Sequence, residues 1–187
     1  MKIKQKERPH RPGMIALKLK QELLATGSLA EMCALAQREI KDPDCRQTLC
    51  FAAGISVYDT LAAEGGKEKQ RFLAKLCALA GENSFYCLMC YSRAAELWME
   101  EGRGELIPGI LSLAEGLMAQ EAIQGCPALC QEMARLWELC ALAASGEERA
   151  LCLNRALELL RPAARVLPAA SGWISALEIK LAEVEAL

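Results

Sequence analysis

The sequence predicts an all-α protein, and three observations support that prediction. Valine and threonine, which are typical of strands, occur only three times each among the 187 residues. Alanine, leucine, glutamate, methionine, lysine and arginine, which favour helices, fill the chain. No stretch keeps the period of two that marks a strand, whereas apolar residues recur with a period of about 3.6. Glycines and prolines then divide the chain into about nine helices.

The N-terminal half is expected to contain five helices, each bounded by turn residues. Ser28 is followed three residues later by Glu31, a capping box that satisfies free amides at a helix start. Pro43 follows Asp42 and fits the first turn of a helix, where its missing N–H has no partner to lose. Gly81 ends the fourth helix. The expected ranges are about 14–25, 28–40, 43–64, 67–80 and 84–101, with the third helix ending at Gly65-Gly66.

The C-terminal half is expected to contain four more helices. A turn at 125–127, with the sequence Gly-Cys-Pro, separates the sixth helix from the seventh. Ser145 and Glu148 form a second capping box that opens the eighth helix, and Pro162 ends or kinks that helix. The expected ranges are about 106–118, 129–144, 145–162 and 171–184.

A short motif recurs along the chain. Residues 32–36 read Met-Cys-Ala-Leu-Ala, and 76–80 and 139–143 both read Leu-Cys-Ala-Leu-Ala, each before a turn and another helix. Segments 92–97 and 154–159, in the helices that follow, also correspond. Short connections make consecutive helices pack antiparallel. Recurring helical hairpins indicate an α-solenoid, and a compact helical bundle is the alternative arrangement.

The clearest family likeness lies between Leu136 and Pro162. The run Ala156-Leu157-Glu158-Leu159, followed closely by Pro162, resembles the end of the second helix of a tetratricopeptide repeat. The chain as a whole thus resembles, in part, the tetratricopeptide-repeat superfamily. That resemblance implies helical hairpins stacked side by side around a concave groove, which takes up a helix or extended segment of a partner.

The sequence predicts no membrane-spanning helix. Such a helix needs about 18 consecutive apolar residues, but Asp59 interrupts the run at 49–63 and Glu115 interrupts the run at 106–118. The N-terminus is charged and has no apolar segment before a small-residue cleavage site, so we expect no secretory signal. We therefore expect a cytoplasmic protein without membrane partners.

Residues 1–13 are predicted to form a flexible basic tail, and residues 14–187 a single helical domain. The formal net charge of −2 provides no overall field that would attract nucleic acid or membrane. The tail, however, concentrates positive charge that suits phosphates or an acidic partner, although a solubilising terminus is the simpler interpretation. Its cations are Lys2, Lys4, Lys6, Arg8 and Arg11.

Ten cysteines in a protein of a reducing compartment are expected to be reduced and to pack as small hydrophobes. Cys33, Cys77 and Cys140 occupy the same position of the recurring motif, so we expect all three in the core. Two further hypotheses are a redox dithiol and a metal or iron–sulfur site, because thiolates at short spacing bind such groups. The candidate metal ligands are Cys87, Cys90, Cys126 and Cys130.

Enzymatic chemistry is not expected, and neither is a cofactor. His10 is the only histidine and lies in the tail, so a triad built on a positioned imidazole has no base. No glycine loop with phosphate-binding spacing is present. The adjacent acids at 100–101 and 147–148 point apart on a helix, and solvated helix ends explain them.

The leading hypothesis is a protein–protein interaction module, an adaptor or chaperone-like protein that binds a segment of another protein in a groove between helices. Methionine side chains suit such a groove because they adapt to different partners. The tryptophans are expected to lie in the core. A tryptophan that is exposed on the surface would instead be a candidate anchor for binding a partner. The relevant residues are Met89, Met99, Met118, Met133, Trp98, Trp137 and Trp173.

Two alternatives remain open at this point. The basic tail suggests a nucleic-acid-associated helical small subunit of a ribonucleoprotein complex, although the acidic remainder of the chain opposes it. The cysteines suggest a helical metalloprotein, which we consider less well supported.

Overall fold

The computed structural model describes residues 12–61, 66–119 and 126–186. Within these ranges the chain forms nine α-helices and one short 3-10 helix, and no strand. The all-α prediction is therefore confirmed. The elements are α1 (Pro12–Thr26), α2 (Leu29–Glu39), α3 (Pro43–Tyr58), α4 (Gly66–Ala80), α5 (Ser84–Glu100), η2 (Gly104–Leu106), α6 (Ile107–Met118), α7 (Pro127–Ala143), α8 (Gly146–Ala163) and α9 (Ala170–Glu185).

Side-chain caps explain where several helices begin. Ser28 accepts a hydrogen bond from the amide of Glu31 at 3.3 Å, as the capping box predicts, and Asp42 caps α3 in the same way. Ser145 precedes α8, but its side chain makes no capping hydrogen bond, so the second capping box is wrong. The reason is the backbone of Gly146, the first residue of α8, whose φ of +54° turns the chain directly after the serine.

The third helix ends earlier than predicted. It stops at Tyr58, whereas the sequence places its end at Gly65-Gly66. Thr60 donates a hydrogen bond from its hydroxyl to the carbonyl of Val57 at 2.6 Å, and such a local bond competes with the next helical turn. Gly65 lies outside the described residues, and Gly66 begins α4.

Prolines lie at helix ends, as their chemistry requires. Helix α1 begins at Pro12, two residues before the expected start, and α3, α6 and α7 each carry a proline in the first turn. Pro162 lies in the last turn of α8, which ends at Ala163, in agreement with the prediction that this proline ends the helix.

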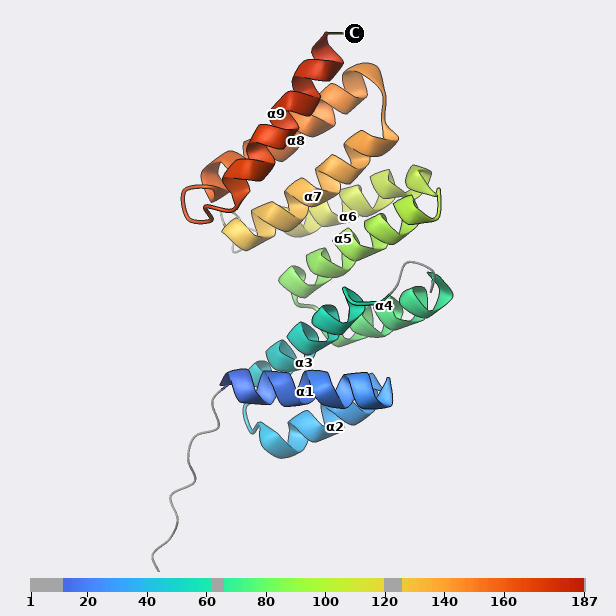
Figure 1. Cartoon of the computed structure of the whole chain (residues 1–187), viewed down its shortest axis with the longest axis vertical. Coiled ribbons are helices and arrows are strands. Elements are labelled where there is room, and N and C mark those ends of the chain that lie inside the picture. The colour runs from blue at the N-terminus through green and yellow to red at the C-terminus, as the bar shows by residue number, and fades with distance from the viewer. Residues whose placement is uncertain (1–11, 62–65, 120–125, 187) are drawn as a thin grey trace, which may run out of the picture.

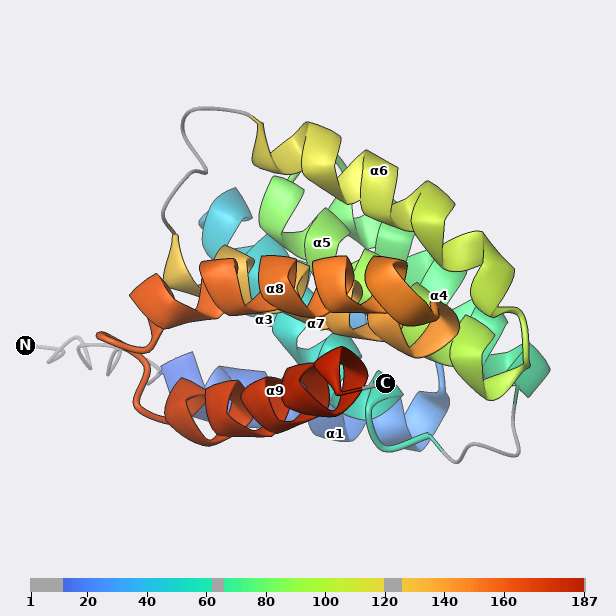
Figure 2. The same cartoon turned by 90° about the horizontal axis from the view of Figure 1, so that it is seen from above.

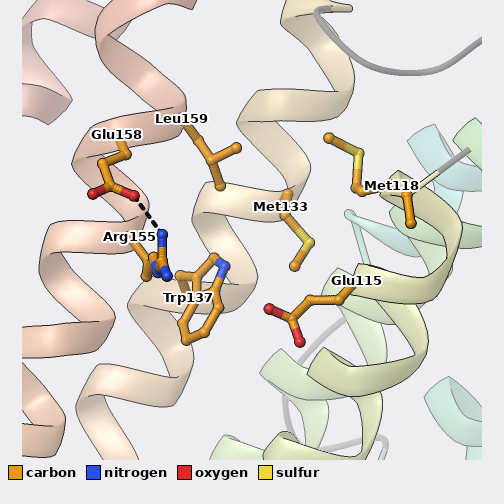
Figure 3. Close-up of a pocket in the computed structure, with 8 residues that line it drawn as sticks. Glu115, Met118, Met133, Trp137, Arg155, Glu158 and Leu159 are labelled. Carbon is orange, nitrogen blue, oxygen red and sulfur yellow. Dashed lines mark hydrogen bonds and ion pairs between the residues drawn. The ribbon is translucent and has the colours of Figure 1, made fainter. Parts of the chain in front are cut away.

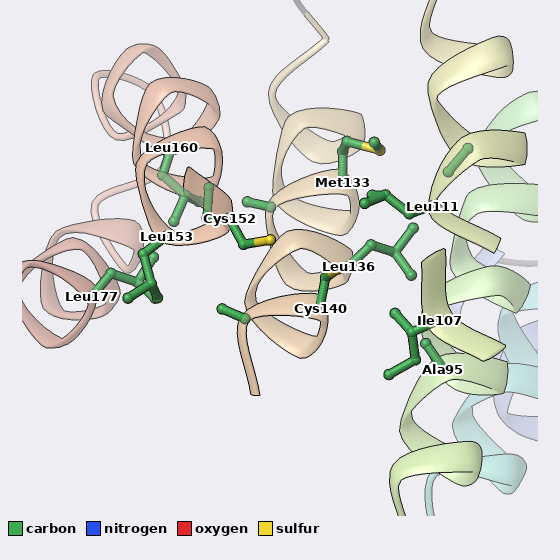
Figure 4. Close-up of a cluster of buried hydrophobic side chains, with 14 of the residues drawn as sticks. Ala95, Ile107, Leu111, Met133, Leu136, Cys140, Cys152, Leu153, Leu160 and Leu177 are labelled. Carbon is green, nitrogen blue, oxygen red and sulfur yellow. The ribbon is translucent and has the colours of Figure 1, made fainter. Parts of the chain in front are cut away.

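The core is divided into two clusters of buried side chains that meet at α5. The first cluster comes from α1 to α5 and includes Tyr86 and Cys90 of α5. The second comes from α5 to α9 and includes Leu88 and Ala95 of α5. Figure 4 shows part of the second cluster, in which side chains of α7 lie between those of α8 and those of α5 and α6. Helix α5 therefore holds the two halves of the molecule together.

Arg93 of α5 is a nearly buried charge at this junction, with 7% of its surface exposed. Its guanidinium donates two hydrogen bonds to Asp59, at 3.1 and 3.2 Å, and one to Glu132 of α7, at 3.3 Å. Burial lowers the pKa of Arg93, but the hydrogen bond to Asp59 and the charge of Glu132 outweigh it and raise the pKa. The network connects the end of α3, the middle of α5 and α7.

The helices follow one another along the long axis of the molecule, from α1 and α2 at one end to α8 and α9 at the other (Figure 1). Each helix packs against its neighbours in the chain, and in addition α1 packs against α3 and α5 against α7. Figure 2 shows α6 and α9 on opposite sides of α7 and α8. The shape is a stack, while the division into antiparallel hairpins stays a prediction. Among the described helices none has the length and apolar character needed to cross a membrane.

Candidate functional site

A pocket of about 400 Å³ opens between α6, α7 and α8 (Figure 3). Helix α7 lies in the middle, with α6 on one side and α8 on the other. We call it the α6–α8 pocket. Its lining comes from Glu115 and Met118 of α6, Ala119 directly after α6, Met133 and Trp137 of α7, and Arg155, Glu158 and Leu159 of α8.

Helical spacing brings these residues to one place. Met133 and Trp137 are four residues apart on α7, so their side chains lie on the same face. Arg155 and Leu159 have the same separation on α8. On the facing surface of α6, Met118 lies one turn beyond the acid at position 115. Each of the three helices therefore contributes two or more side chains from one face, and the packing of the helices brings these faces together around the pocket.

The interior of the α6–α8 pocket is apolar. Met133 is 3% exposed and belongs to the second core cluster. Trp137, Met118 and Leu159 are half-buried and pack against that cluster with part of their surface. An aromatic ring between flexible thioether and leucine side chains is a surface that can adapt to an apolar group of a partner.

Charged residues surround the apolar interior. Arg155 and Glu158 of α8 form an ion pair at 2.8 Å, in which both side chains are more than half exposed. Glu115 faces them from α6, and its carboxylate has no ion pair with any described residue. Counted over the described residues, the rim therefore carries one uncompensated negative charge, which favours a cation on whatever group enters the pocket.

The structure brings together only some of the predicted binding residues. Met118, Met133 and Trp137 line the α6–α8 pocket, whereas Met89 packs against the first core cluster and Met99 against the second, outside that pocket. The three tryptophans are half-buried rather than fully enclosed. Trp98 lies near the guanidinium of Arg103, and Trp173 donates a hydrogen bond to Glu138 at 2.8 Å.

Sequence reasoning did not single out Glu115, Arg155 or Leu159 as members of a site. Glu115 was expected only to interrupt the apolar run at 106–118. The sequence signal that could have located the site is the pair of Arg155 and Glu158 at helical spacing next to the apolar Leu159. Such charged pairs are common on solvated helix faces, so this signal does not distinguish a binding site from an ordinary surface.

A second, polar hollow of about 280 Å³ surrounds the Arg93 network. Its charges are all engaged in ion pairs: Arg93 pairs with Asp59 and Glu132, Arg135 pairs with Glu96, and Lys69 pairs with Glu100 at 3.3 Å. A charged ligand would have to break existing pairs to bind there, so this hollow serves to join helices rather than to receive a ligand.

The candidate metal ligands do not converge on one point. Cys87 and Cys90 lie on α5, Cys126 precedes the first residue of α7, and Cys130 lies within α7. Cys90 is 1% exposed in the first core cluster, whereas Cys126 is exposed. Across the described residues no three histidine, cysteine, aspartate or glutamate side chains group into a metal-binding arrangement.

The three cysteines of the recurring motif are not equivalent. Cys140 is buried, as expected, but Cys33 is half-buried and Cys77 is exposed, so the prediction of a common core position is wrong. In α2 and α4 the preceding residue, Met32 or Leu76, points into the core. Helix α7 packs against α5, α6 and α8, and more of its circumference is therefore covered.

The basic tail and its histidine lie outside the described residues. Lys2, Lys4, Lys6, Arg8, Arg11 and His10 all fall in that segment, and their role in phosphate or partner contacts stays a prediction.

Comparison with known proteins gives no family. No protein-family model matches the chain, and searches of curated proteins and of solved structures return no significant match. The resemblance to tetratricopeptide repeats accordingly stays a prediction.

Proposed function

We propose that the protein is a non-enzymatic interaction module that binds a segment of a partner protein at the α6–α8 pocket. The observation that carries the proposal is the apolar interior formed by Met118, Met133 and Trp137 beside the carboxylate of Glu115, which has no ion pair with a described residue. The proposal includes the adaptor or chaperone-like role and the cytoplasmic location expected from the sequence.

The size and charge of the pocket define the segment that fits. A volume of about 400 Å³ lies near the lower end of ligand pockets, about 300–1,000 Å³, and receives a few anchor side chains of a segment lying across α6 and α8. The anchors are apolar, because a buried polar group without a partner is unfavourable there. A lysine or arginine next to these anchors in the partner contacts Glu115 and thereby fixes the orientation of the bound segment.

The test is a pull-down from native lysate with purified protein, compared between variants. Met118→Glu places a charge inside the pocket and is expected to abolish capture of the partner, because its carboxylate would be desolvated by the apolar anchor. Glu115→Lys repels the flanking cation and is expected to weaken capture severalfold at low salt. Leu24→Glu, at an exposed leucine in a hollow between α1, α3 and α4, is the matched control.

Salt separates this proposal from the nucleic-acid alternative. Binding through buried apolar surface persists at high salt, whereas phosphate contacts weaken steeply as salt rises. Deletion of residues 1–11 is expected to leave capture of the partner unchanged. If Met118→Glu retains the partner and the deletion loses it, or if nucleic acid co-purifies only with the full chain, the α6–α8 pocket is not the binding site.

A further inference from the structure

The recurring cysteines each contact a second cysteine on the following helix. A hydrogen bond joins the thiols of Cys33 in α2 and Cys50 in α3. The same contact joins Cys77 in α4 to Cys90 in α5, and Cys140 in α7 to Cys152 in α8. The repeat therefore places a pair of thiols between successive helices at three levels of the stack.

The three pairs differ in access to solvent. In the pair of Cys33 and Cys50, the first is half-buried and the second is buried. Cys140 and Cys152 are both buried in the second core cluster, and Figure 4 shows Cys152 of α8 directed toward α7. Cys77 is exposed, while its partner Cys90 is 1% exposed and belongs to the first core cluster. An accessible thiol in contact with a buried one is the arrangement of an attacking and a resolving cysteine.

We propose that Cys77 and Cys90 form a redox-active dithiol, which a low-molecular-weight disulfide such as oxidised glutathione converts into a disulfide between α4 and α5. This site is separate from the α6–α8 pocket and does not depend on the function proposed for that pocket. The reaction is the ordinary exchange of thiols and disulfides, and its extent follows the redox state of the surroundings.

The two cysteines perform different steps. The Cys77 thiolate attacks one sulfur of glutathione disulfide, the S–S bond breaks, and one glutathione leaves as a thiolate. Cys90 then loses its proton to solvent and attacks the sulfur of Cys77, and the second glutathione leaves. The two protein thiols lose two electrons and two protons, and the glutathione disulfide gains them as two thiols.

The electrostatics of the pair favour this order. The Cys90 thiol donates a hydrogen bond to Cys77 and lowers the pKa of Cys77 to about 7. The same bond, followed by burial, raises the pKa of Cys90. In the part of the chain that the structure describes, Cys77 also interacts with Cys87 and Tyr91, both on α5, and the charge of Cys77 contributes to the raised pKa of each.

The decisive experiment maps cysteine pairing in the full chain after exposure to oxidised glutathione. Peptide mass spectrometry without reduction is expected to find Cys77 linked to Cys90, with a loss of about 2 Da for the two hydrogens, and dithiothreitol is expected to reverse it. The pair Cys140–Cys152 serves as the matched control and stays reduced, because neither thiol is accessible. A linkage of Cys77 to Cys87, or oxidation of the control pair first, would overturn the assignment.

Two variants assign the roles. In Cys90→Ala the exposed thiol has no resolving partner, so a mixed disulfide of Cys77 with glutathione is expected to accumulate. Without glutathione, alkylation of the Cys77 thiol at pH 7 is also expected to be about fivefold slower in Cys90→Ala than in the unaltered protein. In the unaltered protein the pKa of Cys77 is about 7, and this low pKa increases the fraction of thiolate more than it decreases the nucleophilicity of that thiolate. In Cys77→Ala, Cys90 is expected to remain unmodified. An unchanged alkylation rate in Cys90→Ala, or rapid glutathionylation of Cys90 in Cys77→Ala, contradicts the proposal.

Discussion

Removing the carboxylate of Asp59 tests whether the Arg93 network joins the two halves of the molecule. In Asp59→Ala, Arg93 loses two of its three hydrogen bonds to carboxylates, those at 3.1 and 3.2 Å. Its guanidinium keeps only the bond to Glu132, and its side chain is 8% exposed. The variant therefore leaves a nearly buried cation with unsatisfied donors.

The size of the effect follows from burial. Hydrogen bonds to charged groups contribute about 1.5–3 kcal/mol each, and two of them set an upper limit of about 6 kcal/mol. Asp59, however, is 47% exposed, so water can enter and solvate part of the freed guanidinium. We expect Asp59→Ala to lower the free energy of unfolding by about 2 kcal/mol.

Urea unfolding at pH 7, followed by circular dichroism, measures this loss against a matched pair. Arg161 and Glu178 also meet at 3.1 Å, but their side chains are 60% and 49% exposed, and such surface pairs contribute about 0–1 kcal/mol. Glu178→Ala is therefore the control. If Asp59→Ala costs no more than Glu178→Ala, burial does not strengthen the network, and the reasoning fails.

Three further predictions concern stability. Ser28→Ala should cost about 1 kcal/mol, because its hydroxyl caps α2, whereas Ser145→Ala should cost almost nothing, because its side chain makes no capping bond; thermal unfolding of both variants measures the contrast. Burial raises the pKa of Tyr58 to about 12, so the unfolded chain ionises first and the free energy of unfolding should fall between about pH 10 and 12. Tyr58→Phe should flatten that decline, and an identical pH profile would contradict it. Leu157→Ala, at 1% exposure, should cost about 2–5 kcal/mol, whereas the exposed Leu151→Ala should be nearly neutral in urea unfolding.

Local signals in the sequence predicted much of the fold. Ser28 and Asp42 begin helices because their side chains reach amides only a few residues away, and a short-range rule captures that geometry. The end of α3 at Tyr58 was missed because the residues that follow it, up to the double glycine, contain no proline or glycine to mark a stop. At Ser145 the local rule failed in the opposite way. The residue is a suitable cap, but the backbone conformation of Gly146 prevents its side chain from making the capping bond.

The site was less predictable because it depends on packing between helices. Met133 and Trp137 share a face of α7 in any helical prediction, but which face α6 and α8 leave open is decided by three helices together. Cys77 was expected in the core because its motif matches that of Cys140. The two helices have different neighbours. The cysteine of the motif is therefore buried in α7, as Cys140, and exposed in α4, as Cys77.

The division of the core at α5 bears on how the chain folds during its synthesis. Every buried residue of the first cluster lies between Leu19 and Cys90, so a nascent chain that has emerged as far as α5 already contains that cluster complete. Residues 91–187 alone take about 5–20 s to synthesise. Helical segments with mostly local contacts fold within microseconds to milliseconds. The N-terminal half therefore has time to fold on the ribosome before α6, α7 and α8 are finished, and it presents α5 as a template on which the C-terminal helices assemble.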